Sequence, residues 1–258
     1  MRSLALSVFF LIGCGGTTGS ALVTFAATAS GPADATGGPL SFTSGSGAQV
    51  TLTSATLHID AVYLNQAVPV SGAAEQPCIL PGIYVAQVFG PLDVDLLSPS
   101  SQAFPTQGEG TQTPAKTAEV WLTGGDINAA ADPTVIFSVA GTAVQNSQTF
   151  PFTAKITIGA NRQPAVTNPA MPGANPICHE RIVTKILVNV TPTNLGTLVL
   201  TVDPRPMFNS VDFTTLTQVS TTPLLYQIPD TSAGPGGALF DGLKANYGVY
   251  AFAWEAGL

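Results

Sequence analysis

The residues best suited to chemistry are two histidines with neighbouring carboxylates. His58 and Asp60 lie two apart in an alternating segment, so both side chains would point to one face of a strand. His179 and Glu180 directly follow Cys178. If the fold brought the two pairs together, imidazole and carboxylate could hold zinc or copper. The alternative is a solvated strand face at His58 and a polar surface cluster at His179. The absence of a spaced histidine pair favours this alternative, and we expect no metal or other cofactor.

Other carboxylates have weaker chemical patterns. Asp93 and Asp95 would share one strand face and could bind calcium or act on a sugar, but such a pair is also typical of a solvent-facing strand. Asp126 follows two glycines, as in part of a calcium loop, without the later acidic ligand. The sequence has no G-x-S-x-G turn, which an α/β-hydrolase would need. We therefore predict no catalytic residues and a non-enzymatic protein. The alternative is an envelope metal-binding protein or hydrolase that uses His58, His179 and nearby carboxylates.

The N-terminus predicts export. Arg2 precedes an apolar run, Leu4 to Ile12, which is too short to cross a bilayer as a helix of about 20 residues but fits a secretory signal. Leu11-Ile12-Gly13-Cys14 resembles the lipobox of bacterial lipoproteins. This resemblance implies a signal peptide over residues 1–13, lipid on Cys14 and a lipidated tether over residues 14–20. It also implies a cell-envelope location. Gly15 favours the outer membrane, facing either the periplasm or the outside.

With Cys14 acylated, Cys78 and Cys178 remain as an even pair in an oxidising compartment. A disulfide between them would close a loop of about 100 residues and would restrict the unfolded chain. Two buried free thiols are the alternative.

Composition limits the partners. Charged residues make up 9% of the chain and hydrophobic residues 45%, which favours a packed core over a disordered chain. The net charge is −7 and basic residues are scattered, so nucleic-acid binding is not expected. Anionic lipid would repel the chain, so lipid chains must provide the attachment. The remaining partner is a protein or glycan that the sequence does not identify.

Alternating segments separated by glycine and proline predict an all-β fold. We expect an antiparallel β-sandwich, Ig-like or jelly-roll-like, over residues 21–258 as a single domain, with two stacked modules as the alternative. Residues 191–194 suggest a hairpin between the strands at 182–190 and 195–202. One short C-terminal helix is expected at 238–246. The predicted strands span residues 21–29, 49–53, 55–65, 83–89, 91–97, 117–123, 134–140, 150–158, 182–190, 195–202, 208–213, 224–228 and 249–254.

Three details of this pattern matter for function. In the strand at 55–65, Leu57, Ile59, Ala61 and Tyr63 should share the buried face. Tyr250, Phe252 and Trp254 should share one face of the last strand, and Trp121 should lie in the core. A buried row at 250–254 would seal the core, whereas an exposed row could stack on sugars. The polar segments 98–114 and 163–176 are expected to be surface loops, with or without a binding role.

Three segments, Val94 to Leu97, Leu198 to Phe213 and Leu239 to Trp254, are similar to surface lipoproteins of myxobacteria-like bacteria that have no assigned role. The strand order is also similar to a family of domains of unknown function in bacterial surface lipoproteins. This resemblance implies a β-sandwich and leaves the function open.

Overall fold

The computed structural model describes residues 20–67, 82–123, 132–162 and 180–257. These residues form a mostly β fold in which fourteen strands belong to one sheet. The prediction of a β-rich chain with a short helix near the C-terminus is confirmed. The strands are β1 (Leu22–Ser30), β2 (Leu40–Thr43), β3 (Gln49–Asn65), β4 (Tyr84–Asp95), β5 (Gln102–Ala103), β6 (Gly108–Thr111), β7 (Ala115–Trp121), β8 (Asp132–Gln145), β9 (Gln148–Ile158), β10 (Ile182–Val190), β11 (Thr197–Val202), β12 (Thr217–Thr221), β13 (Leu224–Gln227) and β14 (Tyr250–Glu255).

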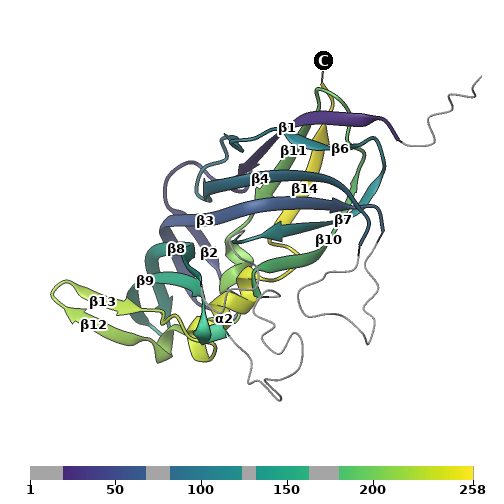
Figure 1. Ribbon diagram of the computed structural model, residues 1–258. Coiled ribbons are helices and arrows are strands. Elements are labelled where there is room, and N and C mark those ends of the chain that lie inside the picture. Colours follow the sequence, from purple (N-terminus) through teal and green to yellow (C-terminus); the bar gives the residue numbers. More distant parts are fainter. Residues whose placement is uncertain (1–19, 68–81, 124–131, 163–179, 258) are drawn as a thin grey trace, which may run out of the picture.

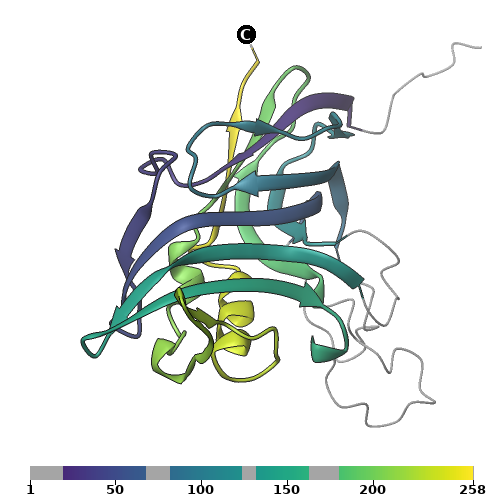
Figure 2. The ribbon, with the colours of Figure 1, turned by 90° about the vertical axis from the view of Figure 1, so that its left-hand side faces the viewer.

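The long strand β3 organises the sheet. The main path of the sheet runs β12-β13-β9-β8-β3-β4-β6-β1-β11-β14, and β7 and β10 branch from the far half of β3. β4 pairs along one side of β3, while β8 and β7 follow each other along the other side. In Figure 1, β4, β3 and β7 run side by side across the middle of the molecule. Figure 2 shows β3, β8 and β9 curving together.

The sheet is mixed, so the expectation of a purely antiparallel arrangement is wrong. β1 pairs with β11 in parallel, and β13 pairs with β9 in parallel. The hairpin expected at residues 191–194 does not form, because β10 pairs with β7 whereas β11 pairs with β1 and β14. In the intervening link, the Asn194 side chain accepts a hydrogen bond from the Thr24 backbone N–H at 2.9 Å and thereby attaches the chain to β1.

Two further predictions about local structure are wrong. The segment 208–213 is not a strand, because Pro204 and Pro206 favour the 3₁₀ turn η2 (Arg205–Phe208) and Asp212 caps the 3₁₀ turn η3 (Phe213–Thr215). The segment 98–114 is not only a loop, because it contains β5 and β6. A Cβ on Gly110 would lie 2.4 Å from the Val85 backbone oxygen, so glycine is needed for the strands to approach.

The hydrophobic core is one continuous cluster that combines inward residues of distant strands. Leu57 of β3, Phe137 of β8 and Leu200 of β11 all belong to it and are at most 1% exposed. The helix α2 (Gly234–Leu243) closes the lower end of the molecule in Figure 1, with Leu239 and Leu243 buried. The helix begins four residues before the expected start at residue 238 and ends three residues before the expected end at residue 246.

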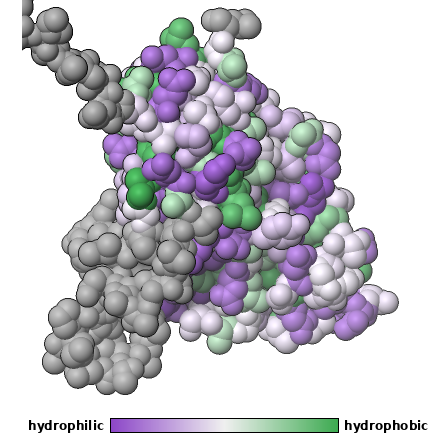
Figure 3. Space-filling view, turned by 90° about the vertical axis from the view of Figure 1, so that its right-hand side faces the viewer, coloured by the Kyte–Doolittle hydropathy of each residue, from purple (hydrophilic) through white to green (hydrophobic). Residues whose placement is uncertain are grey.

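Two surface features lie away from the core. The β12–β13 hairpin projects from the body of the molecule at the lower left of Figure 1. On the opposite side, the described surface mixes hydrophilic and hydrophobic side chains in small groups (Figure 3). Scattered hydrophobic residues of this kind are ordinary on a folded surface.

Candidate ligand-binding site

A bulge in the pairing of β3 with β4 decides which residues reach the outer face of the sheet. The register between β3 and β4 shifts between Ile59 and Ala61. Two residues of β4, Gly90 and Pro91, lie against one residue of β3, Asp60, and the in–out alternation of β3 breaks at the same place, so the side chains beyond it point the opposite way. Leu57 and Ile59 therefore point to the core, but beyond the bulge Val62 and Leu64 take that role. The prediction that Ala61 and Tyr63 face the core is wrong for this reason.

The outer face beyond the bulge is a grid of cross-strand partners. Ala61 lies opposite Phe89 of β4 and opposite Trp121 of β7. Tyr63, two residues further along β3, lies opposite Gln87 of β4 and opposite Glu119 of β7. Directly opposite residues of paired strands point to the same side, so aromatic and acidic side chains gather on this face.

The small side chain of Ala61 between two large rings leaves a cavity of ≈ 230 Å³. Ala61 is only 3% exposed, yet it is not part of the hydrophobic cluster, in agreement with its outward direction. We call this cavity the Ala61 notch. It is lined by Asp60, Ala61, Tyr63, Phe89, Gly90 and Trp121.

The rings around the notch stand at steep angles to one another. The Tyr63 ring lies 5.0 Å from that of Trp121 with an interplanar angle of 52°, and 6.1 Å from that of Phe89 at 84°. On its far side, Tyr63 contacts Tyr84 edge-on, with ring centroids 5.3 Å apart. The rings therefore form walls, whereas a flat platform would need rings close to one plane.

A buried carboxyl group lies beside these rings. Glu119 is 0% exposed and accepts hydrogen bonds from Asn65 Nδ2 at 3.1 Å, from Trp121 Nε1 at 3.1 Å and from the Tyr84 hydroxyl at 3.2 Å. Burial raises the pKa of Glu119, and these three hydrogen bonds oppose the rise because they favour the charged form. Burial also raises the pKa of Tyr63, and the neighbouring Glu119 carboxyl raises it further.

His58 lies on the same outer face, on the other side of the bulge. It is directly opposite Asp93 of β4, and its Nδ1 lies 2.7 Å from Asp93 Oδ1. Its Nε2 lies 3.8 Å from Asp60 Oδ1, so the prediction that His58 and Asp60 share a face is confirmed. A catalytic triad would need a nucleophile at the second ring nitrogen, whereas this histidine has a carboxylate on each side.

The second half of the predicted metal site lies elsewhere or outside the described residues. Glu180 forms an ion pair with Lys244 of the segment after α2, at 3.2 Å. His179 lies outside the described residues, as do Cys14, Cys78, Cys178, Asp126 and segment 163–176. Within the described ranges, no group of three or more His, Cys, Asp or Glu side chains could hold a metal ion. In the same ranges, no helix is long and apolar enough to cross a membrane.

The remaining sequence candidates have structural roles. Asp93 and Asp95 are both exposed, as expected for one strand face, but Asp95 accepts a hydrogen bond from the Leu97 backbone N–H at 2.9 Å. Tyr250 is 5% exposed, and Phe252 and Trp254 pack against the core, so this row is not an open platform for sugars. Trp121 is half-buried on the outer face, so its predicted core position is wrong.

Neither Glu119 nor Tyr84 is predicted from the sequence as a site residue. The signal for Glu119 was present, because it lies two residues before Trp121 in β7 and so shares its face. Tyr84 follows a segment that the structure does not describe, and its alignment with Glu119 depends on the pairing of β4 and β7 with β3. Only the register of the sheet brings these residues together.

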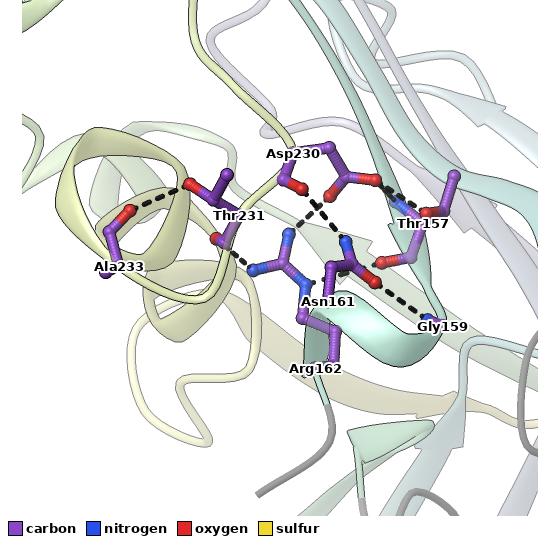
Figure 4. A network of polar contacts seen from close by, with 7 residues as sticks. All are labelled: Thr157, Gly159, Asn161, Arg162, Asp230, Thr231 and Ala233. Carbon is purple, nitrogen blue, oxygen red and sulfur yellow. Dashed lines mark hydrogen bonds and ion pairs between the residues drawn. The ribbon is translucent and has the colours of Figure 1, made fainter.

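A second cluster of charge lies at the other end of the sheet, where β9 meets the chain before α2. Arg162 follows β9, and its guanidinium pairs with Asp230 and donates to the backbone oxygens of Thr157 and Thr231 (Figure 4). Its Cζ also lies 4.2 Å from the centre of the Phe240 ring of α2. Asp230 accepts from the hydroxyl and backbone N–H of Thr157 as well. This cluster joins the end of β9 to the segment before α2 (Figure 4).

No family model, no curated protein and no solved structure matches the chain.

Proposed function

We propose that this chain is a lipid-anchored protein of the bacterial cell envelope that binds a small ligand in the Ala61 notch without chemically changing it. The observation that carries this proposal is the notch itself, a cavity with three aromatic walls and a carboxylate on the outer face of β3, β4 and β7. Sites that bind small molecules are concave and mostly apolar, with a few polar groups that fix orientation. The anchor is proposed from the lipobox at Leu11 to Cys14.

The alternative of a metal-binding protein or hydrolase at His58 has less support. The contact between His58 and Asp93 resembles the pair that orients a catalytic base, but Asp60 faces the other ring nitrogen. For the fold, we propose a sandwich-like arrangement in which the sheet curves over the core. The supporting observation is that Leu57 of β3 and Leu200 of β11 belong to one hydrophobic cluster.

The anchor is tested by mass spectrometry and fractionation. The mature protein should begin at Cys14 and carry acyl chains, and Cys14→Ser should move it from the membrane to the soluble fraction. A mature protein that retains Met1 and has no acyl mass would contradict the proposed anchor.

The binding role is tested by screening small molecules against the full-length protein by ligand-observed NMR. Ala61→Leu should fill the notch, so ligands of the notch should lose their signal with this variant. Ala253→Leu is the matched control, because Ala253 lies on the exposed face of β14. If no compound distinguishes the wild type from Ala61→Leu, the proposed binding role is wrong.

A further inference from the structure

We infer that the Ala61 notch recognises a methylated ammonium group of a small molecule, such as the trimethylammonium group of choline. The inference rests on the proposed function and adds the chemical class of the ligand. It follows from the ring angles, from the charges beside the rings and from the size of the cavity.

The rings suit a rounded cation better than a flat sugar. Tyr63 and Phe89 stand at 84° and Tyr63 and Trp121 at 52°, and all three residues line the cavity. Aromatic walls of this kind hold quaternary ammonium groups, because the negative ring faces attract the positive methyl groups. A pyranose ring would instead need one broad, accessible ring face.

Negative charge strengthens this preference at two points. Asp60 lines the notch directly, so it places a carboxylate at the edge of the cavity. Trp121 donates its indole N–H to the buried Glu119 carboxyl at 3.1 Å, which increases the electron density of the ring that lines the notch. The hydrogen-bond donors that contact Glu119 among the described residues are neutral and favour its charged form, against the effect of burial, which raises its pKa.

The volume of the notch limits the ligand to a small group. At ≈ 230 Å³ it is smaller than the about 300–1,000 Å³ typical of pockets for drug-sized ligands. A headgroup fits this space, whereas a large organic molecule would extend beyond it. The net charge of −7 also favours the approach of cations.

The test is a fluorescence titration of the full-length protein in dodecyl maltoside. The chain has two tryptophans, so Trp254→Phe leaves Trp121 as the reporter of the notch. Choline chloride should change the Trp121 emission in a saturable way. The neutral isostere 3,3-dimethylbutan-1-ol, in which carbon replaces the nitrogen, should bind at least about tenfold more weakly.

Two pairs of variants locate the binding. Ala61→Leu should abolish the response to choline, whereas the control Ala253→Leu should keep it. Asp60→Asn should weaken choline binding about three- to tenfold, whereas Glu255→Gln, which removes one charge from an exposed position of β14, should change it less than twofold.

The outcomes separate the ligand class from the proposed function. If choline and its neutral isostere bind equally, or if other ligands bind in the notch and choline does not, the ligand class is wrong and the binding role stands. Choline binding that Ala61→Leu leaves unchanged would overturn the inference, because the site would lie elsewhere. Binding to phosphatidylcholine vesicles without binding to free choline would overturn the assignment to a small molecule.

Discussion

Two clusters of charge in this molecule differ in how their charges are compensated. Arg162 and Asp230 neutralise each other, and the guanidinium also donates to backbone oxygens (Figure 4). Its Cζ lies 4.2 Å from the centre of the Phe240 ring. Glu119 is buried, as Arg162 is, but Asn65, Tyr84 and Trp121 give it neutral hydrogen bonds.

This difference separates a cluster that supports the fold from one that suits a ligand. A closed ion pair has little potential left to act on its surroundings. The Glu119 carboxyl is held by the dipoles of neutral donors instead, and it lies next to the aromatic walls of a cavity. Four predictions sharpen this comparison.

The largest effect is expected at the closed cluster. Arg162→Met should lower the free energy of unfolding by about 2–4 kcal/mol, because it leaves the Asp230 carboxylate without its cation. The expected loss of stability is smaller than for a fully buried ion pair because the Asp230 side chain is 24% exposed. Urea unfolding measures it. Choline binding should not change, and a loss below about 0.5 kcal/mol would contradict a role in holding β9 to the segment before α2.

A smaller loss of stability is expected at the Glu119 cluster. Tyr84→Phe removes the hydroxyl that donates to Glu119, which should cost about 0.5–1.5 kcal/mol and raise the pKa of Glu119 further. The control is Tyr247→Phe, because Tyr247 is 90% exposed. Equal unfolding midpoints in urea for the two variants would show that the hydroxyl contact does not stabilise the fold.

The third prediction concerns pH. Because burial raises the pKa of Glu119, the folded chain keeps a proton there at pH values where the unfolded chain has released it. The contribution of Glu119 to the free energy of unfolding is therefore largest below its ordinary pKa of 4.5. It declines as the pH rises through the raised pKa. The stability of the wild type relative to Glu119→Gln should decline over this window. The exposed Glu109→Gln should show no such slope, and a flat difference for Glu119→Gln would contradict the prediction.

The smallest effect is expected at His58 and Asp93. Asp93 is 70% exposed, so its pair with His58 is screened by water. A double-mutant cycle with His58→Ala and Asp93→Ala should give a coupling of no more than about 0.5 kcal/mol. A coupling above about 1.5 kcal/mol would mean that this pair is more than a surface contact.

The sequence predicts the strands well where alternation is regular, and it fails where tertiary contacts decide. The alternation in β1 and β9 indicates both strands to within two residues. The bulge after Ile59 has no signal in the alternation, so Tyr63 is assigned to the wrong face. The glycines of β6 read as a loop, although they permit a close approach between strands.

The candidate site is predictable only in part. His58 and Asp60 are identified correctly as neighbours because both lie before the bulge. The Ala61 notch depends on three strands in register, and an alanine carries no chemical signal of its own. Pairing between strands far apart in the sequence therefore determines the site, and local patterns do not reveal it.

The most direct test of the account is an NMR titration that observes the two tryptophan indole N–H groups. Choline should shift the Trp121 signal progressively and leave the Trp254 signal in place, because only Trp121 lines the notch. The shift should disappear in Ala61→Leu. A Trp121 signal that stays fixed at saturating choline, or that moves equally in Ala61→Leu, would contradict the claim that this cavity binds a methylated ammonium group.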